Sequence, residues 1–111
     1  SAGGVNWDGA NGTISSSNFT YNAAGGNGGG AIRWTGVGGM LTNSNFIVNT
    51  AKGANGGAVR WNEPNGTIIN STFIGNSAGV GGGVCWEGIT GNLINCKFIN
   101  NTGESNGGAV R

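Results

Sequence analysis

Residues 56–78 read GGAVRWNEPNGTIINSTFIGNSA, and the order of residue types in this stretch recurs along the chain. Its opening, GGAVRW, has a close copy in GGAIRW at residues 29–34 and a looser copy in GGGVCW at residues 81–86. The sequence stops on a further copy, GGAVR at residues 107–111. Self-similarity at a fixed interval of roughly 20–50 residues is typical of repeat architectures, so the repeat is the first constraint on the fold.

Aromatic residues and asparagines set the length of the repeat. Successive tryptophans are 27, 27 and 25 residues apart, and the phenylalanines and the asparagines three residues after them keep these intervals. The three columns are Trp7, Trp34, Trp61 and Trp86, then Phe19, Phe46, Phe73 and Phe98, then Asn22, Asn49, Asn76 and Asn101. Two aliphatic columns run in the same register, namely Val5, Ile32, Val59, Val84 and Val110, and Ile14, Leu41, Ile68 and Leu93. The columns divide a single segment, residues 1–111, into units at 1–27, 28–54, 55–80 and 81–106, with a fifth unit starting at 107–111.

Each unit alternates apolar and polar residues over short runs, which favours strands over helices. In the unit at 55–80 these runs are AVRW, GTII and STFIG, separated by glycine and asparagine. Three short strands per repeat of 25–27 residues predict an all-β fold, a parallel β-helix of about four coils in which each strand pairs with its copy in the next coil. The usual chirality of parallel crossovers makes it right-handed. An antiparallel sandwich or barrel would instead show turns of varied sequence and no aligned columns.

Asparagine and glycine are expected at the corners of each coil. The column Asn43, Asn70 and Asn95, with Ser16 in the first unit, lies between an aliphatic and a phenylalanine column. Asparagine tolerates left-handed backbone, and stacked amides can hydrogen-bond from coil to coil, so an asparagine ladder is predicted at this corner. A second ladder is predicted for the asparagines that follow the phenylalanines. The glycine pairs before the first strand predict a sharp turn with positive φ.

Composition and charge exclude several classes of protein. Glycine supplies 26 of 111 residues, but a single proline excludes collagen, which is rich in proline. The formal net charge of +1 gives no strong field for nucleic acid or for an anionic membrane. No apolar run approaches the roughly 20 residues of a membrane-spanning segment. Because the sequence starts and stops within repeats, we expect a piece of a longer protein, or a filament subunit whose copies stack end to end.

Residues that catalyse reactions are scarce. Histidine is absent, and the carboxylates are Asp8, Glu63, Glu87 and Glu104. The three that follow tryptophans could align on one face, and a glycoside hydrolase needs two carboxylates about 5–9.5 Å apart, so a polysaccharide-active enzyme is an alternative. The calcium-binding repeat of other β-helices repeats an aspartate, which this chain does not. We therefore expect no catalytic residue, no metal site and no cofactor.

Arginine recurs directly before tryptophan. Arg33, Arg60 and Arg111 share a column with Asn6 and Cys85, and strand alternation turns this column outward if the adjacent aliphatics are buried. An exposed stripe of guanidinium groups could bind acidic surface glycans or a partner's carboxylates, or could serve only to keep a sheet face soluble. The tryptophans share the parity of the buried aliphatics, which favours a core stack over a sugar-binding platform.

Threonines, cysteines and possible glycosylation sites give further expectations. Thr13 and Thr67 share one position of the repeat, which raises ice binding as a third function, although the second and fourth units lack the threonine. Parity turns Cys96 inward and Cys85 outward, which favours free thiols over a disulfide. A sequon at Asn70 falls in the predicted corner ladder and is expected to be inaccessible. The possible N-glycosylation sites are Asn11, Asn18, Asn65 and Asn100.

The combination of GGAI or GGAV with Phe-x-x-Asn resembles the repeat of chlamydial polymorphic membrane proteins. The fuller unit at residues 56–78 is similar to repeats of the adhesin-like surface proteins of methanogenic archaea. The unit that carries Gly83 and Cys85 departs from the pattern at those positions. The resemblance covers the whole chain and implies a right-handed parallel β-helix, an extracellular or cell-surface location and a structural, adhesive or fibre-forming role. The partners it implies are copies of the chain itself, neighbouring repeats or surface glycans.

Overall fold

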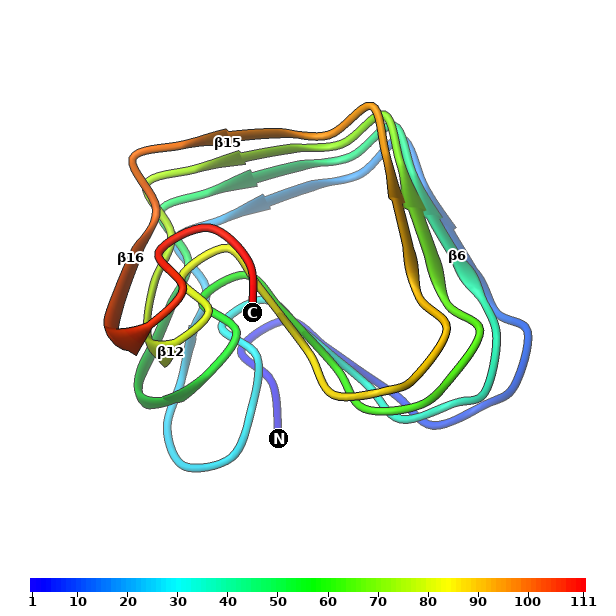
Figure 1. Ribbon diagram of the computed structural model, residues 1–111, viewed down its shortest axis with the longest axis horizontal. Helices are drawn as coiled ribbons and strands as arrows, with labels where there is room; N and C mark the ends of the chain where they lie inside the picture. Colours follow the sequence, from blue (N-terminus) through cyan, green and yellow to red (C-terminus); the bar gives the residue numbers. More distant parts are fainter.

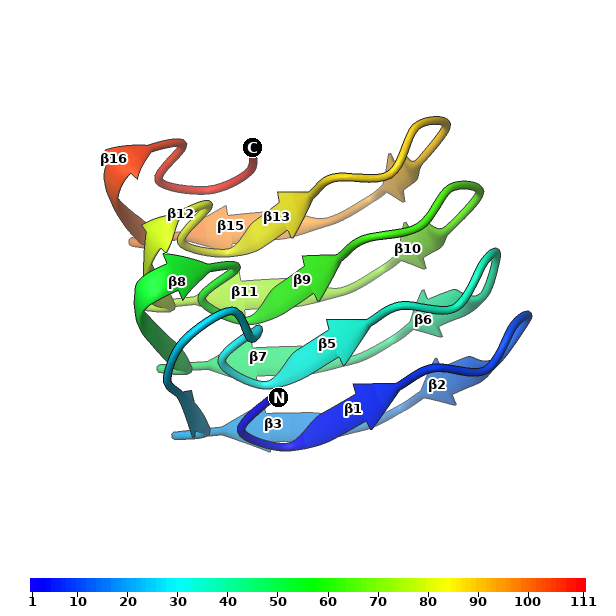
Figure 2. The same ribbon diagram turned by 90° about the horizontal axis from the view of Figure 1, so that it is seen from below.

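The computed structural model describes residues 1–111, which form strands and turns without a helix. Sixteen short strands make four sheets of four strands each, and every sheet takes one strand from each successive coil. The chain is therefore a β-solenoid of four coils, which wind right-handed about a common axis (Figures 1 and 2). None of its secondary structure meets the length and hydropathy of a membrane-spanning helix. This architecture confirms the predicted all-β parallel β-helix.

We name the sheets A to D in the order in which a coil visits them. Sheet A consists of β1 (Val5–Trp7), β5 (Ile32–Trp34), β9 (Val59–Trp61) and β13 (Val84–Trp86). Sheet B consists of β2 (Thr13–Ser15), β6 (Met40–Thr42), β10 (Thr67–Ile69) and β14 (Asn92–Ile94). Sheet C consists of β3 (Asn18–Thr20), β7 (Asn45–Ile47), β11 (Thr72–Ile74) and β15 (Lys97–Ile99). Sheet D consists of β4 (Ala23–Ala24), β8 (Thr50–Asn55), β12 (Ser77–Val80) and β16 (Thr102–Asn106).

The register of the sheets places like residues on like. Trp34 pairs with Trp7 on one side and with Trp61 on the other, and the phenylalanine and aliphatic columns follow the same rule. The pairing in sheet D shifts between Ala78 and Val80, in the segment where the third repeat is two residues shorter. The irregularity is thus confined to one sheet, and the other three keep their columns.

Each coil contains four strands rather than the predicted three. Sheet D occupies the segment that the sequence pattern indicates as a connection of variable length. Its inward column is alanine in three coils and Gly103 in the fourth. Ala51, Ala54 and Ala78 form a small buried cluster apart from the main core. Side chains this small give little hydrophobic periodicity, so the pattern does not separate this strand from a loop.

The corner between sheets B and C has the predicted left-handed backbone. Ser16, Asn43, Asn70 and Asn95 have φ values between 48° and 51°. The predicted amide ladder at this corner is wrong, because these side chains are exposed and do not hydrogen-bond to one another. The backbone amides bond instead, as from Asn43 N–H to the Ile69 carbonyl at 3.1 Å.

Glycine is required at the start of each coil for two separate reasons. Gly56 has a φ of 73°, as the predicted turn needs. Gly57 has no such φ, but a Cβ placed on it would lie 1.9 Å from the Gly82 carbonyl oxygen. A third glycine, Gly66, precedes sheet B, and a Cβ there would lie 2.2 Å from the Trp61 indole. The repeated glycines therefore allow close backbone approach as well as turning.

The core is a set of ladders that run along the solenoid axis. Twelve buried residues form one cluster, ten from sheets A, B and C together with Ala31 and Ala58, which directly precede strands of sheet A. In the second and third coils its aromatic and aliphatic side chains are fully buried, whereas Trp7, Phe19, Trp86 and Phe98 of the end coils are only partly buried. Burial of each coil thus depends on its neighbours, as in other repeat proteins.

Candidate functional site

The tryptophan column is a stack in the core. Ring centroids of successive tryptophans are 5.2, 4.4 and 4.9 Å apart, and the interplanar angles do not exceed 19°. Trp34 and Trp61 have no exposed surface, so neither offers a ring face to a sugar. The phenylalanines stack in the same way at 4.8 to 5.0 Å.

The asparagines that follow the phenylalanines form a continuous polar ladder inside the coil. The Asn76 Oδ1 accepts hydrogen bonds from the Asn49 backbone N–H at 2.8 Å and from the Asn49 Nδ2 at 2.9 Å. The Asn76 Nδ2 donates to the Phe46 carbonyl at 3.0 Å and to the Asn101 Oδ1 at 2.9 Å. Each buried amide is therefore fully hydrogen-bonded, which removes the cost of burying it.

The outer face of sheet A carries the arginine column. The register places Arg33 between Asn6 and Arg60, and Cys85 follows Arg60. The column points out of the coil, as parity predicts, but it is not the exposed stripe that we expected. Arg33 is half-buried and the Arg60 side chain is only 13% exposed, whereas Arg111 in the start of the fifth coil is exposed. The connection from sheet D returns toward the axis before the next coil begins (Figure 1), and Arg60 Nη1 donates to the Asn27 carbonyl in that connection.

Arg60 belongs to an ion pair that the sequence analysis missed. Its Nη2 lies 2.8 and 3.0 Å from the two carboxylate oxygens of Glu87, one coil further along, in a bidentate arrangement. The amides of Asn55 and Asn62 also donate to this carboxylate. Burial alone would raise the pKa of Glu87, but the hydrogen bonds from Arg60 and Asn55 and the charges of Arg60 and Arg111 hold that pKa below its usual range. Glu87 directly follows Trp86 and so shares the outward parity of the arginines, which is the signal that could have identified the pair.

Both cysteines are free thiols. Cys85 lies on the outer face of sheet A but is fully buried there. Burial raises the pKa of its thiol, the Glu87 carboxylate adds to the rise, and Arg111 and Arg60 oppose it. Cys96 points into the coil, where its sulfur lies 3.5 Å from the Ile94 carbonyl oxygen. It occupies the position at which Ser44 and Ser71 of other coils bond to the backbone.

Asp8 and Glu87 are too far apart to form the carboxylate pair that a glycosidase needs, and the Glu87 carboxylate, one coil beyond Glu63, is already bound by Arg60. Asp8 and Glu87 both follow tryptophans, but they lie in the first and fourth coils. Three strand spacings separate them by about 14 Å, beyond the range for either glycosidase mechanism. Asp8 instead accepts hydrogen bonds from Asn6 and Thr35. No three histidine, cysteine or carboxylate side chains lie close enough together to hold a metal ion.

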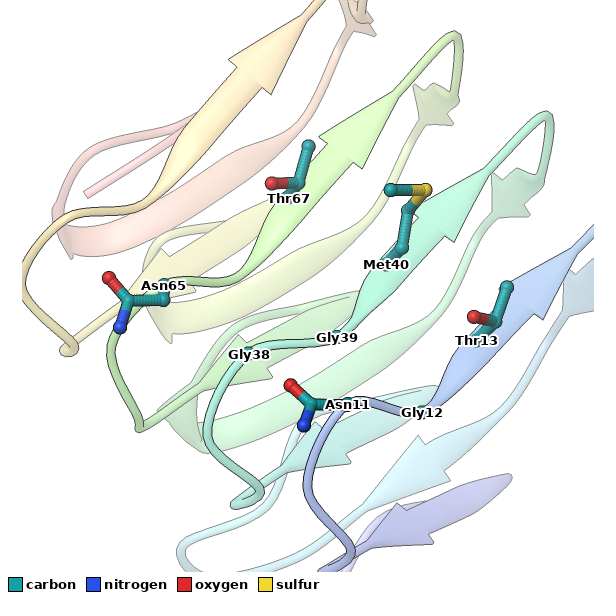
Figure 3. Close-up of a pocket in the computed structure, with 8 residues that line it drawn as sticks. All are labelled: Asn11, Gly12, Thr13, Gly38, Gly39, Met40, Asn65 and Thr67. Atoms are coloured by element: carbon teal, nitrogen blue, oxygen red, sulfur yellow. The ribbon is translucent and has the colours of Figure 1, made fainter.

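A shallow pocket of about 360 Å³ lies at the turns that lead from sheet A into sheet B (Figure 3). Asn11 and Asn65 project beside it from the first and third coils, and Gly38 occupies their position in the second coil. The missing side chain at Gly38 contributes to the hollow. The lining contains no charged residue.

The predicted glycosylation sites and the threonines lie on the outer surface. Met40 separates Thr13 from Thr67 in the register of sheet B, so the threonines do not form a regular array of the kind that would match an ice lattice. Asn70, which we expected to be inaccessible, is exposed. The exposed sequon asparagines also include Asn11, Asn18, Asn65 and Asn100.

No protein-family model matches this chain, and no match was found among curated proteins or solved structures. The adhesin-like and polymorphic membrane protein motifs are therefore a resemblance of sequence pattern, and the fold rests on the geometry described above.

Proposed function

We propose that this chain is a structural repeat segment of a cell-surface or extracellular protein, in which stacked coils extend a stalk or fibre and present an adhesive face. The repeat motifs support the adhesive and extracellular parts of this proposal. Exposed sequons are compatible with such a location.

The end surfaces carry the proposal, because each is the complement of the other. The asparagine ladder ends on an acceptor at one end, the Asn22 Oδ1, and on a donor at the other, the Asn101 Nδ2, which has a spare hydrogen. Leu93 of the last full coil is 37% exposed, whereas Leu41 and Ile68 in the same column are fully buried. A pocket of about 320 Å³ lies beside Trp86 and Leu93 at this end.

A further coil would satisfy these groups and continue every ladder, whether it came from the same polypeptide or from another copy. The unpaired edges of β14 to β16 offer backbone donors and acceptors to such a coil. If the coil came from another copy, the contact would be head to tail and would not close, which generates a filament.

Sedimentation velocity and negative-stain electron microscopy at several protein concentrations test stacking. We expect rods that lengthen with concentration, and Leu93→Lys should abolish them by placing a charge on the end surface. Ile89→Lys is the control, because Ile89 is 76% exposed in an outward turn. A protein that stays monomeric at all concentrations would contradict self-stacking.

A further inference from the structure

We propose that Arg33 binds the carboxylate group of an acidic saccharide on the outer face of sheet A. This inference rests on the adhesive role proposed above and names a class of ligand for it. It depends on side chains in the middle of the solenoid, so stacking and binding can fail independently.

The Arg60–Glu87 pair shows what a guanidinium of this column binds. Glu87 lies one coil beyond Arg60, two positions after Cys85, the register partner of Arg60, and directly after the end of β13. Its carboxylate receives two hydrogen bonds from Arg60 Nη2 and a third from Arg60 Nε at 3.3 Å. Planar, bidentate recognition of carboxylates is the geometry that arginine favours. The protein thus contains an internal example of the proposed contact.

Arg33 lacks the corresponding partner. The repeat places Asn62 relative to Arg33 as it places Glu87 relative to Arg60. Asn62 is neutral, its Nδ2 donates to Glu87, and its Oδ1 accepts no hydrogen bond from Arg33. Arg33 forms no ion pair, and its Nε is buried without a hydrogen-bond partner. A half-buried guanidinium therefore retains an uncompensated charge on this face.

Neighbouring groups do not neutralise Arg33. The Glu87 carboxylate is already paired with Arg60. Asp8, on the other side, accepts from Asn6 and Thr35 and forms no ion pair with Arg33. A carboxylate from outside the chain would therefore be the first to complement the charge of Arg33.

The surroundings of Arg33 favour a saccharide as the source of that carboxylate. Besides Arg60, which Glu87 pairs, the outward side chains nearest to it are Asn6, Thr35 and Asn62, which offer amides and a hydroxyl rather than apolar contacts. Asn6, in the preceding coil of the same column, is exposed. A uronic acid carries hydroxyl groups close to its carboxylate, so one sugar can supply the anion for Arg33 and a hydroxyl for the Asn6 amide.

Isothermal titration calorimetry with galacturonic acid oligomers tests this assignment. Neutral galactose oligomers, which lack the carboxylate, and oligoglutamate, which supplies carboxylates on a peptide, are the comparison ligands. Arg33→Gln should weaken binding of the acidic oligomer by about ten- to a hundredfold, as expected for a lost charged hydrogen bond. Asn62→Asp should weaken it similarly while keeping Arg33, because the new carboxylate would occupy the guanidinium. Lys97→Gln, on sheet C, removes the same charge elsewhere and should leave binding within about twofold.

Binding that both sheet A variants weaken, with unchanged binding by the Lys97 variant, would support the proposal. An equal loss in the Lys97 variant would overturn it in favour of diffuse charge attraction. Equal binding of the neutral oligomer, stronger binding of oligoglutamate, or no binding of the acidic oligomer would also overturn it. Circular dichroism of each variant establishes that the solenoid is folded. Because the titration is read at concentrations where sedimentation shows monomers, a failure of binding is distinct from a failure of stacking.

Discussion

The Asn76 side-chain amide makes four hydrogen bonds, and none of them can be replaced by water, because the residue is fully buried. Asn76→Ala would leave the Asn49 N–H and the Phe46 carbonyl without these partners. An orphaned buried polar group costs about 1–3 kcal/mol, so we expect a loss of about 3 kcal/mol or more in the free energy of unfolding. Urea denaturation measures this loss.

Asn92→Ala is the matched control, because Asn92 is an exposed strand residue whose side chain makes no hydrogen bond. Its effect should stay within about 0.5 kcal/mol. If both variants lost a similar free energy of unfolding, the hydrogen bonds of the asparagine ladder would not be the source of the stability.

At the scale of the strand and its corners, the sequence predicts backbone conformation better than side-chain contacts. Asparagine at Asn43, Asn70 and Asn95 indicates a left-handed corner, and the structure has one. Whether such a side chain bonds to its copies depends on whether it points into the coil, which the residue type does not reveal. Sheet D was missed for a related reason, because an inward column of alanine has no hydrophobic contrast with glycine-rich neighbours.

The corner between sheets C and D contains a strained position. Val48 has a φ of 54°, which is unfavourable for a β-branched residue, whereas Gly75 and Asn100 occupy the same corner in later coils. Left-handed backbone costs an ordinary residue about 1–2 kcal/mol, and asparagine tolerates it. We expect Val48→Asn to stabilise the protein by about 0.5–1 kcal/mol in urea denaturation. Val37→Asn, at an exposed valine without positive φ, should not stabilise it, and a gain there as large as at Val48 would contradict the strain argument.

On sheet A, the Arg60–Glu87 pair links two coils and should make stability depend on pH. The folded-state pKa of Glu87 is lowered, so its contribution is present above the unfolded-state pKa and is lost as the pH falls through the folded-state pKa. Glu87→Gln should cost about 1 kcal/mol at pH 7, since the pair is only partly buried. The difference from the parent protein should begin to shrink below about pH 4, where the unfolded-state carboxyl becomes protonated before the folded-state carboxyl does. Thermal melts of both proteins between pH 3 and pH 7 measure this difference in stability.

Glu104→Gln serves as the control for this pair, because Glu104 is exposed and forms no ion pair. It should change stability little at either pH. A Glu87 effect that persisted unchanged at pH 3 would show that packing, rather than charge, is responsible.

For the whole molecule, the fold could be read from the sequence because one physical rule repeats along the chain. Stacked coils bury like residues on like, so the tryptophan column in the sequence corresponds to a stack of tryptophans along the solenoid axis. The candidate binding face could be read only in part. Parity places Arg33 and Arg60 outside, but the different environments of the two arginines depend on Glu87 and Asn62, which lie a full repeat further along.

The same dependence on neighbours predicts an uneven distribution of stability along the axis. Strands β5 and β9 have coils on both sides and fully buried tryptophans, whereas β14 and β15 of the last full coil have a coil on one side only. In a solenoid, local stability is approximately the sum of repeat and interface terms, so an end coil that lacks one interface opens before the global transition. We expect amides of β14 and β15 to exchange with solvent at least about tenfold faster than those of β7 and β11 in the monomer, measured by NMR hydrogen exchange. Raising the protein concentration should slow exchange in the end coils selectively if copies stack, because stacking supplies the missing interface. Uniform protection along the axis at low concentration would contradict the nearest-neighbour origin of the stability.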